Sequence, residues 1–328
     1  DAESFDNFAS LCKQKYDCFQ IVFAVASADD DVLPVIRRLM EEFPKVDIAL
    51  VVDDRVYGPN YKVCNLVNAF PFAKHDIIIV CDSDIRVGEK YLEEVCSYFN
   101  DPVVGLVCSL YRTSEAKCCA SAIEALGFTV EMVPNVMAAV RLEGLTFALG
   151  ASMAVRRDAL EKIGGFEALV DYLADDYQLG NRVFLAGYRL ELSDYFVESV
   201  IREERLTTVL TRQLRWCRTM RVSRPGGYFA SGITQPALAS VAALLTGGFA
   251  FGGAAVLMLY LVRCFVGIVF SRKYLCDGLL PKYLWLLPIR DLLASATWAM
   301  AFVGDKVSWR GHCYRVLSGG RIEVIKGG

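Results

Sequence analysis

Short apolar runs alternate with amphipathic segments over the first two thirds of the chain. An apolar run bounded by turn residues predicts a buried strand, and apolar residues that recur every three or four positions predict a helix. We expect strands at 20–26, 47–52, 77–81, 103–109 and 147–155. We expect helices at 32–43, 90–99 and 157–163, the last of which ends at the stop signal Gly164-Gly165. This alternation predicts an α/β fold with a mainly parallel sheet.

A long uncharged segment follows the α/β pattern. No charged residue occurs between Arg224 and Arg263. At roughly 20 residues per crossing, this segment is too long for one membrane span and predicts two helices. The alternative is one long, bent, buried helix, but helices of globular proteins seldom exceed about 20 residues. The tight turn between the two helices is expected at Gly247, Gly248, Gly252 and Gly253.

The composition also predicts that part of the chain is integral to a membrane, since 54% of the residues are hydrophobic and 22% are charged. A third apolar segment, at 283–303, contains Arg290 and Asp291. A charge near the centre of a bilayer costs at least about 2.5–3.5 kcal/mol on insertion scales. We therefore expect this pair to lie at the level of the lipid headgroups or to face a protein interior.

Basic residues flank the apolar segments, and such flanks are typical of the cytoplasmic side of a membrane. The first apolar segment is preceded by Arg202, Arg205, Arg212, Arg215, Arg218, Arg221 and Arg224. The two later loops contain Arg272, Lys273 and Lys282, and then Lys306, Arg310, Arg315 and Arg321. If both loops are cytoplasmic, the segment at 283–303 has to be re-entrant or interfacial. The net charge of −3 gives no indication of nucleic-acid binding.

The 12 cysteines form no Cys-x-x-Cys pair, and His75 and His312 are far apart in the sequence, so no zinc site is indicated. The scattered cysteines are typical of reduced, buried thiols rather than of a disulfide framework. They predict a reducing compartment, with the catalytic part of the chain facing the cytoplasm.

Two carboxylates directly follow the apolar strand expected at 77–81. Asp82 and Asp84 are separated by one residue and would lie at the carboxyl end of that strand, where open α/β folds bind ligands. Hard oxygen ligands of this kind suit Mg²⁺ or Mn²⁺ carrying a diphosphate. The alternative is a solvated turn, which is the commoner meaning of an isolated Asp-x-Asp.

A second pair of acids, Asp175 and Asp176, opens an amphipathic helix after a turn. One interpretation is that Asp175 is only a helix N-cap, a role worth about 1 kcal/mol. The other is that one of the two carboxylates accepts a proton from an acceptor hydroxyl, which requires a base opposite the leaving group.

The sequence RQLRW places Arg212 and Arg215 three residues apart on one face of a helix, with Trp216 beside them. Guanidinium groups present paired donors to phosphate oxygens, which suits a departing diphosphate. Trp216 could form a wall of the pocket. The alternative is a basic amphipathic helix that anchors the chain to lipid headgroups.

Taken in this order, the motifs resemble those of a GT-A, family-2 type glycosyltransferase that is processive or modifies lipids. The resemblance is greatest to ceramide glucosyltransferases and their bacterial hopanoid-associated relatives. It rests on DSD at 82–84, DD at 175–176, RQLRW at 212–216 and the apolar segments that follow. It extends to GPNYKVCNL at 58–66, LGASMAVRRDALEKIGGF at 149–166 and SWRGHCYR at 308–315, and so covers essentially the whole chain.

The resemblance implies a Rossmann-like, nucleotide-sugar-binding catalytic domain at 1–224. Transmembrane or interfacial helices would follow at 225–304, and a basic tail at 305–328. The family usually has an Asp where this chain has Ser27, and Asp29 and Asp30 are the acids available to replace it. We also expect that the chain begins after the family's N-terminal anchor and first strand.

Roles for individual residues also follow from the resemblance. Asp82 and Asp84 would bind the metal and the diphosphate of a UDP-sugar, with Asp84 the more direct metal ligand. Lys62 and Asn65 would line the donor pocket. Asp176 would be the general base, with Asp175 supporting it. The residues expected to close over the diphosphate and the mouth of the acceptor site are Arg212, Arg215 and Trp216.

The implied reaction is a direct, inverting transfer of a hexose, glucose above all, from a UDP-sugar to a lipid hydroxyl such as that of ceramide. Transfer of N-acetylglucosamine to a hopanoid remains open, and the residues at 149–153 are expected to select the sugar. A polysaccharide synthase, or a catalytically silent protein that binds lipid or nucleotide sugar, also remains open. Within the favoured class, Arg290 and Asp291 would border the path of the lipid acceptor.

Overall fold

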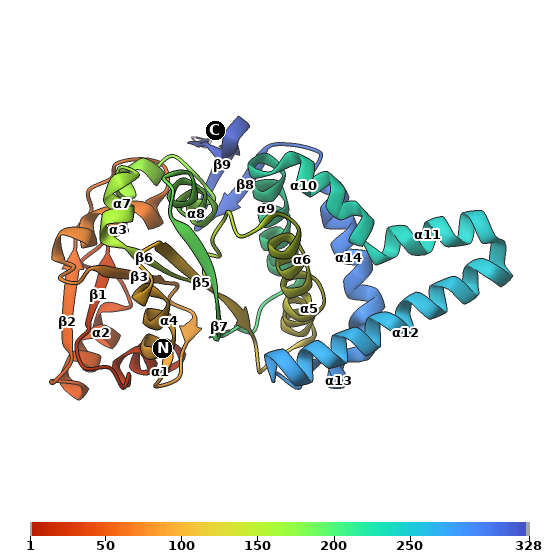
Figure 1. The fold of residues 1–328 in the computed structure, drawn as a ribbon. Helices are drawn as coiled ribbons and strands as arrows, with labels where there is room; N and C mark the ends of the chain where they lie inside the picture. Colours follow the sequence, from red (N-terminus) through yellow and green to blue (C-terminus); the bar gives the residue numbers. More distant parts are fainter. Residues whose placement is uncertain (1, 326–328) are drawn as a thin grey trace. The chain divides into compact units, whose positions relative to one another are not determined.

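The computed structural model describes residues 2–325 and divides the chain into two compact units (Figure 1). Unit 1 contains the residues up to Tyr111 and Ala139–Val200, and unit 2 contains Arg112–Ala138 and the residues from Ile201 onward. The boundaries of these units differ from the predicted domain boundaries near 224 and 304. The predicted division into a catalytic domain, membrane helices and a tail stays a prediction.

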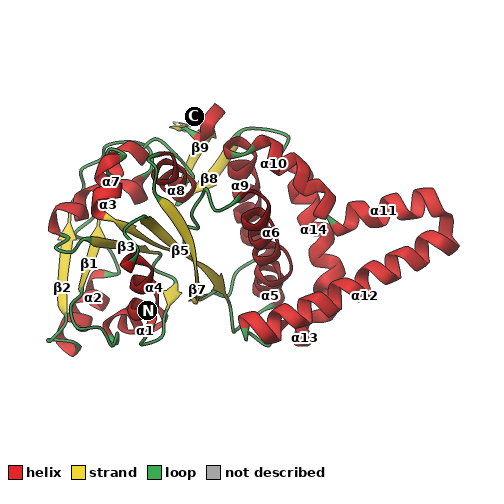
Figure 2. Cartoon of the chain, viewed as in Figure 1, coloured by secondary structure: helices red, strands yellow, loops and turns green. Residues whose placement is uncertain are grey.

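Unit 1 has an α/β architecture in which helices lie on both sides of the strands (Figure 2). Its elements are α1 (Ala2–Cys12), β1 (Gln20–Val25), α2 (Leu33–Glu42), β2 (Asp47–Val52), α3 (Tyr61–Ala69), β3 (Ile77–Cys81), β4 (Ile85–Arg86), α4 (Tyr91–Ser97), β5 (Val104–Arg112), β6 (Ser152–Arg156), α7 (Arg157–Lys162), α8 (Asp175–Leu185) and β7 (Arg189–Ser199). All five predicted strands and all three predicted helices are present, although β6 begins later than expected.

The sheets of unit 1 are not mainly parallel, so this part of the prediction was wrong. β1 and β2 pair in parallel. The larger sheet has the order β3-β6-β5-β7-β4, and its pairs β3–β6, β5–β6 and β4–β7 are antiparallel. A strand that is buried on both faces reads as a continuous apolar run whichever way its neighbours point. The apolar pattern therefore predicted the strands but not their directions.

Two of the apolar clusters of unit 1 lie on the two faces of β6. Met153 and Val155 belong to an apolar cluster that also includes residues of α3, α7 and α8. Ala154 belongs to a second cluster, with residues of β4 and α4. Because successive side chains of a strand point to opposite faces, β6 contributes to both clusters. It leads out of the loop that contains Gly150, and the carbonyl oxygen of Ala151 in this loop accepts a hydrogen bond of 3.1 Å from the N–H of Asp82.

Unit 2 is mainly helical. Its helices are α5 (Cys119–Gly127), α9 (Leu206–Ser223), α10 (Pro225–Ala230), α11 (Pro236–Gly247), α12 (Gly253–Val269), α13 (Leu279–Tyr283) and α14 (Leu287–Met300), and α6 (Val133–Glu143) continues from unit 2 into unit 1. The predicted basic tail forms an antiparallel sheet of β8 (Lys306–Trp309), β9 (His312–Val316) and β10 (Ile322–Val324).

The uncharged segment forms two helices, α11 and α12, joined by a tight turn (Figure 1). Gly248 has a φ of 63°, in the left-handed region that favours glycine. A Cβ on Gly252 would lie 2.5 Å from the carbonyl oxygen of Ala243, so only glycine allows the two backbones to approach so closely. The predicted pair of helices with a glycine turn is confirmed, and one continuous bent helix is excluded.

Two helical stretches are long and apolar enough to cross a membrane by length and composition, namely Cys119–Glu143 and Pro236–Leu275. The first is half buried within the protein and was not predicted from the sequence. Arg290 and Asp291 both lie in the protein interior, which is the second of the two positions predicted for them. Arg290 pairs with Glu131, and the Asp291 carboxylate accepts a hydrogen bond of 2.7 Å from Nη2 of Arg263.

Candidate active site

Three of the predicted site residues meet in unit 1. The ammonium of Lys62, near the start of α3, lies 2.9 Å from Oδ1 of Asp82 and 3.4 Å from Oδ2 of Asp175. Asp82 directly follows β3, and Asp175 is the first residue of α8. Burial alone would lower the pKa of Lys62, but Asp175 and Asp82 raise it above its ordinary value. Lys62 therefore stays charged and links the two acidic motifs.

Asn60 also belongs to this cluster, although the sequence motifs predicted no role for it. It is buried and caps α3, since its Oδ1 accepts a hydrogen bond of 3.1 Å from the backbone N–H of Val63. Its Nδ2 donates to the carbonyl oxygen of Tyr172 at 2.7 Å and to Oδ1 of Asp175 at 3.4 Å. Asn60 thus fixes the Asp175 carboxylate relative to α3. An Asn directly before a helix is an N-cap signal that could have indicated the first of these contacts, but the sequence pattern did not predict α3 itself.

Asp175 is not the N-cap of α8. The N-cap is Ala174, which has no capping side chain. The Asp175 carboxylate is instead held by Lys62 and Asn60. This arrangement excludes the N-cap interpretation of Asp175.

Asp176 faces Gly150, in the loop that leads into β6. Burial, and after it the charge of Asp175, raise the pKa of Asp176 to about 6, although Lys62 acts in the opposite direction. A carboxylate with a pKa close to neutral pH is suited to accept a proton. A Cβ on Gly150 would lie 2.9 Å from Oδ2 of Asp176, so the glycine leaves space for this carboxylate.

Gly150→Ala should therefore displace the Asp176 carboxylate and lower the turnover of the enzyme by about tenfold to 100-fold, since small misplacements of reacting groups have effects of this size. The matched control is Gly226→Ala, because a Cβ on Gly226 has no neighbouring atom within 4 Å. The measurement is steady-state turnover together with thermal unfolding. Equal turnover in the two variants would contradict the assigned position of Asp176.

Asp82 and Asp84, the predicted metal ligands, place two carboxylates on the segment between β3 and β4. Asp84 is exposed, and its backbone carbonyl accepts a hydrogen bond of 2.8 Å from the N–H of Val200, which anchors this segment. Among residues 2–325, no three or more His, Cys, Asp or Glu side chains are grouped in a way that could hold a metal ion. One or two carboxylates are nevertheless sufficient for Mg²⁺ when substrate phosphates complete its coordination. The donor set therefore fits a metal that arrives with a diphosphate.

The second predicted donor-pocket residue, Asn65, lies on α3 three positions after Lys62. This spacing places the two side chains on the same face of the helix. Asn65 is half-buried.

The RQLRW motif lies on α9 of unit 2. Arg212 donates from Nε to Glu124 at 2.8 Å and from Nη2 to Glu204 at 2.7 Å, so two carboxylates already neutralise its charge. The guanidinium of Arg215 lies 5.6 Å from the centre of the Trp309 ring. Trp309 belongs to the SWRGHCYR motif, so the structure brings together two motifs that are far apart in the sequence. Trp216 is half-buried.

Ser27 and the acids after it form the turn before α2. The Ser27 hydroxyl oxygen accepts a hydrogen bond of 3.1 Å from the N–H of Asp29. Oδ1 of Asp30 accepts one of 2.9 Å from the N–H of Val32. Asp30 therefore already has a local structural role. That Asp29 or Asp30 takes over the function of the family's Asp, in place of which this chain has Ser27, stays a prediction.

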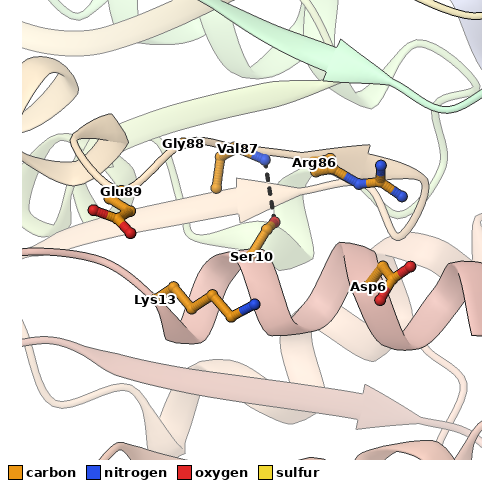
Figure 3. Close-up of a pocket in the computed structure, with 7 residues that line it drawn as sticks. All are labelled: Asp6, Ser10, Lys13, Arg86, Val87, Gly88 and Glu89. Carbon is orange, nitrogen blue, oxygen red and sulfur yellow. Dashed lines mark hydrogen bonds between the residues drawn. The ribbon is translucent and has the colours of Figure 1, made fainter.

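A separate surface cavity of about 300 Å³ lies between α1 and the segment after β4 (Figure 3). At this cavity, the Ser10 hydroxyl accepts a hydrogen bond of 3.1 Å from the N–H of Val87. None of the predicted site residues lines the cavity, so it is distinct from the cluster around Lys62.

Comparison with known proteins identifies the family to which the chain belongs. The family model described as "Glycosyl transferase family 21" matches residues 1–322. Ceramide glucosyltransferase 3 of Caenorhabditis elegans is 22% identical over 98% of this chain and 72% of its own length, and ceramide glucosyltransferase 1 of the same organism is 21% identical over 99% and 71%.

Among solved structures, the mannosyltransferase PcManGT from Pyrobaculum calidifontis, in complex with GDP-Man and Mn²⁺, has a TM-score of 0.55 and 18% identity. The similarity covers 92% of this chain and 82% of that one, and it confirms the predicted GT-A fold. Because the family model spans almost the entire sequence, the chain belongs to glycosyl transferase family 21.

Proposed function

We propose that this chain is a membrane-bound, inverting glycosyltransferase that transfers glucose from UDP-glucose to the primary hydroxyl of ceramide. The observation that carries the proposal is the cluster in which Lys62 joins Asp82 to Asp175, beside Asp176 with its raised pKa. Such a cluster combines a site for a diphosphate-bound cation with a nearby proton acceptor. The sequence similarity to two ceramide glucosyltransferases supports glucose as the sugar and ceramide as the acceptor.

In the proposed reaction, the Asp176 carboxylate accepts the proton of the acceptor hydroxyl. The hydroxyl oxygen then forms a bond to the anomeric carbon of the sugar, and the bond from that carbon to the UDP oxygen breaks. The electron pair of this bond leaves with UDP, so the configuration at the anomeric carbon is inverted and no covalent enzyme intermediate forms. Lys62 and Asn60 keep the Asp175 carboxylate in place beside the base.

Asp82 and Asp84 would hold Mg²⁺ or Mn²⁺ together with the diphosphate. When bound, the metal would neutralise charge that develops on the departing UDP. Mn²⁺ in the complex of the mannosyltransferase of the same fold supports this proposal. Lys62 and Asn65 would contact the donor, and Arg212, Arg215 and Trp216 are proposed to act on the diphosphate and the acceptor.

We further propose that the catalytic residues face the cytoplasm. The basic residues at 202–224, directly before the uncharged segment, support this orientation. All twelve cysteines are free thiols, as suits a reducing compartment.

The test is transfer of radiolabelled sugar from UDP-glucose or UDP-N-acetylglucosamine into lipids by membranes that contain the chain. We expect labelled glucosylceramide with UDP-glucose. EDTA should abolish the labelling, and added Mn²⁺ or Mg²⁺ should restore it. Asp84→Asn should lose metal-dependent transfer, whereas Asp194→Asn, which changes an exposed carboxylate on β7, should remain active.

A different labelled product would contradict the proposed function and indicate another one. Label from UDP-N-acetylglucosamine in a hopanoid would change both donor and acceptor, and label in an insoluble polymer would indicate a polysaccharide synthase. Absence of label from both donors, with UDP still bound, would indicate a silent binding protein.

A further inference from the structure

The α11–α12 hairpin is the most exposed apolar element of the described chain. Only 6% of the most apolar window in Pro236–Leu275 is buried within the protein. At its tip, Phe249 is 97% exposed and Phe251 is 82% exposed. We propose that this hairpin enters a single leaflet of a lipid bilayer and ends near the bilayer centre, so that it does not cross the membrane. The proposal deepens the membrane association proposed above and is independent of the donor sugar.

The length of the hairpin suits one leaflet. α11 has 12 residues and is therefore roughly 18 Å long at 1.5 Å per residue. The hydrocarbon core of a bilayer is about 30 Å thick, so one leaflet contributes about half of this. In α12, only ten positions separate Gly253 from Arg263, which corresponds to roughly 15 Å. Both arms match the depth of one leaflet and are too short to cross two.

Polar groups hold both arms of the hairpin to α14 and define its base. Gln235, which precedes α11, is buried and accepts a hydrogen bond of 3.1 Å from the Ser295 hydroxyl. Arg263 of α12 donates from Nε to Asp291 at 2.7 Å. Both partners, Ser295 and Asp291, lie on α14. The polar anchors therefore hold the base of the hairpin in the protein, and only the apolar part beyond them is free to enter lipid.

The serine and threonine hydroxyls of the hairpin are satisfied within its own helices. Ser240 donates to the carbonyl oxygen of Pro236 at 2.8 Å, and Thr246 donates to that of Ala242 at 2.9 Å. Bonds of this type leave no hydroxyl proton that needs water, as hydrocarbon surroundings require. The apolar faces also lack the charged or polar rim that an interface with another protein usually has. This favours lipid over a second copy of the chain as the occupant.

A hairpin of this depth also places the basic residues before and after it on the same side of the membrane. Both of its ends emerge on the side of the membrane from which it entered. The arginines at 202–224 before it and the basic residues at 272–273 after it then lie on one face, which agrees with the positive-inside rule. No further crossing is needed to place the basic residues of the C-terminal sheet on that face.

The proposal is tested by synthesis of the full chain in a cell-free reaction that contains phosphatidylcholine vesicles, followed by flotation. The double variant Phe249→Asp/Phe251→Asp should reduce the vesicle-bound fraction at least about tenfold, because two large apolar side chains are lost from the lipid. The matched control is Phe72→Asp, which changes an exposed phenylalanine of unit 1 and should bind vesicles as the native chain does.

The depth of the tip is measured with a fluorescent amino acid at position 249 in the native background. We expect strong quenching by nitroxides deep in the acyl chains and none by iodide on either side of the vesicle. Quenching by iodide trapped inside the vesicle would show that the hairpin crosses the bilayer and would overturn the proposal. So would unchanged flotation of the double variant, or a native chain that self-associates without binding vesicles. None of these readouts depends on sugar transfer, so failure of the proposed activity and failure of this inference are distinguishable.

Discussion

Replacement of Asp176 by Asn is expected to lower kcat for sugar transfer by about 10²–10⁴-fold, the usual contribution of a general base. The amide is nearly isosteric but cannot accept the proton of the acceptor hydroxyl. Binding of UDP should be unchanged, because the proposed diphosphate ligands Asp82 and Asp84 remain. The measurement is initial-rate kinetics with UDP-glucose and ceramide, with Asp171→Asn, an exposed acid before α8, as the matched control.

The folded stability of this variant separates a catalytic role from a structural one. The pKa of Asp176 is raised to about 6 by burial and by Asp175, so the folded state disfavours its charged form. The contribution of this group to stability is therefore present at low pH and is lost as the pH rises through about 6. Asp176→Asn should unfold at the same or a higher temperature than the native chain at pH 7. A marked fall in both activity and unfolding temperature would indicate a structural role instead.

The same raised pKa predicts the acid limb of the native enzyme's activity. Because the base has to be deprotonated, kcat/KM should fall about tenfold per pH unit below pH 6 and level off above it. A pH–rate profile of the native chain with saturating metal tests this. An acid limb centred near pH 4, the ordinary range of a carboxyl group, would contradict the assigned environment of Asp176.

The sequence predicted the parts of the site that depend on local pattern. Asp82 was placed by the apolar run of β3, and the acids at the start of α8 by the turn before an amphipathic helix. The glycine turn between α11 and α12 followed from the length of an uncharged segment. In each case, the periodicity of a short stretch contains the necessary information.

The parts that the sequence could not predict depend on contacts between distant segments. Asn60 and Asp175 are 115 positions apart, and no local pattern shows that the amide holds the carboxylate. The proximity of Gly150 to Asp176 joins the loop before β6 to α8, and no local pattern reveals this contact. The pairing of Arg212 with Glu124 likewise joins α9 to a helix 88 positions earlier. Local sequence could suggest that Arg212 is a phosphate ligand but could not show that two carboxylates already hold it.

Lys62→Met is expected to have the largest effect on stability among the site variants. It would leave Asp82, Asp175 and Asp176 close together with no cation between them. Removal of one partner from a buried ion pair is costly, and after allowance for the partial exposure of Asp82 we expect a loss of about 2–4 kcal/mol of unfolding free energy. The measurement is denaturant unfolding in detergent at pH 7.

The variant should also move the acid limb of kcat/KM to higher pH, because the charge of Lys62 holds down the pKa of Asp176. Lys62→Arg keeps a cation at this position and should preserve most of the stability and the native acid limb. Lys74→Met is the matched surface control, since the Lys74–Asp47 pair is well exposed and contributes little. If Lys62→Met behaved like Lys74→Met in both measurements, Lys62 would not be the group that couples the two acidic motifs. If only the stability fell, Lys62 would support the fold without setting the protonation of the base.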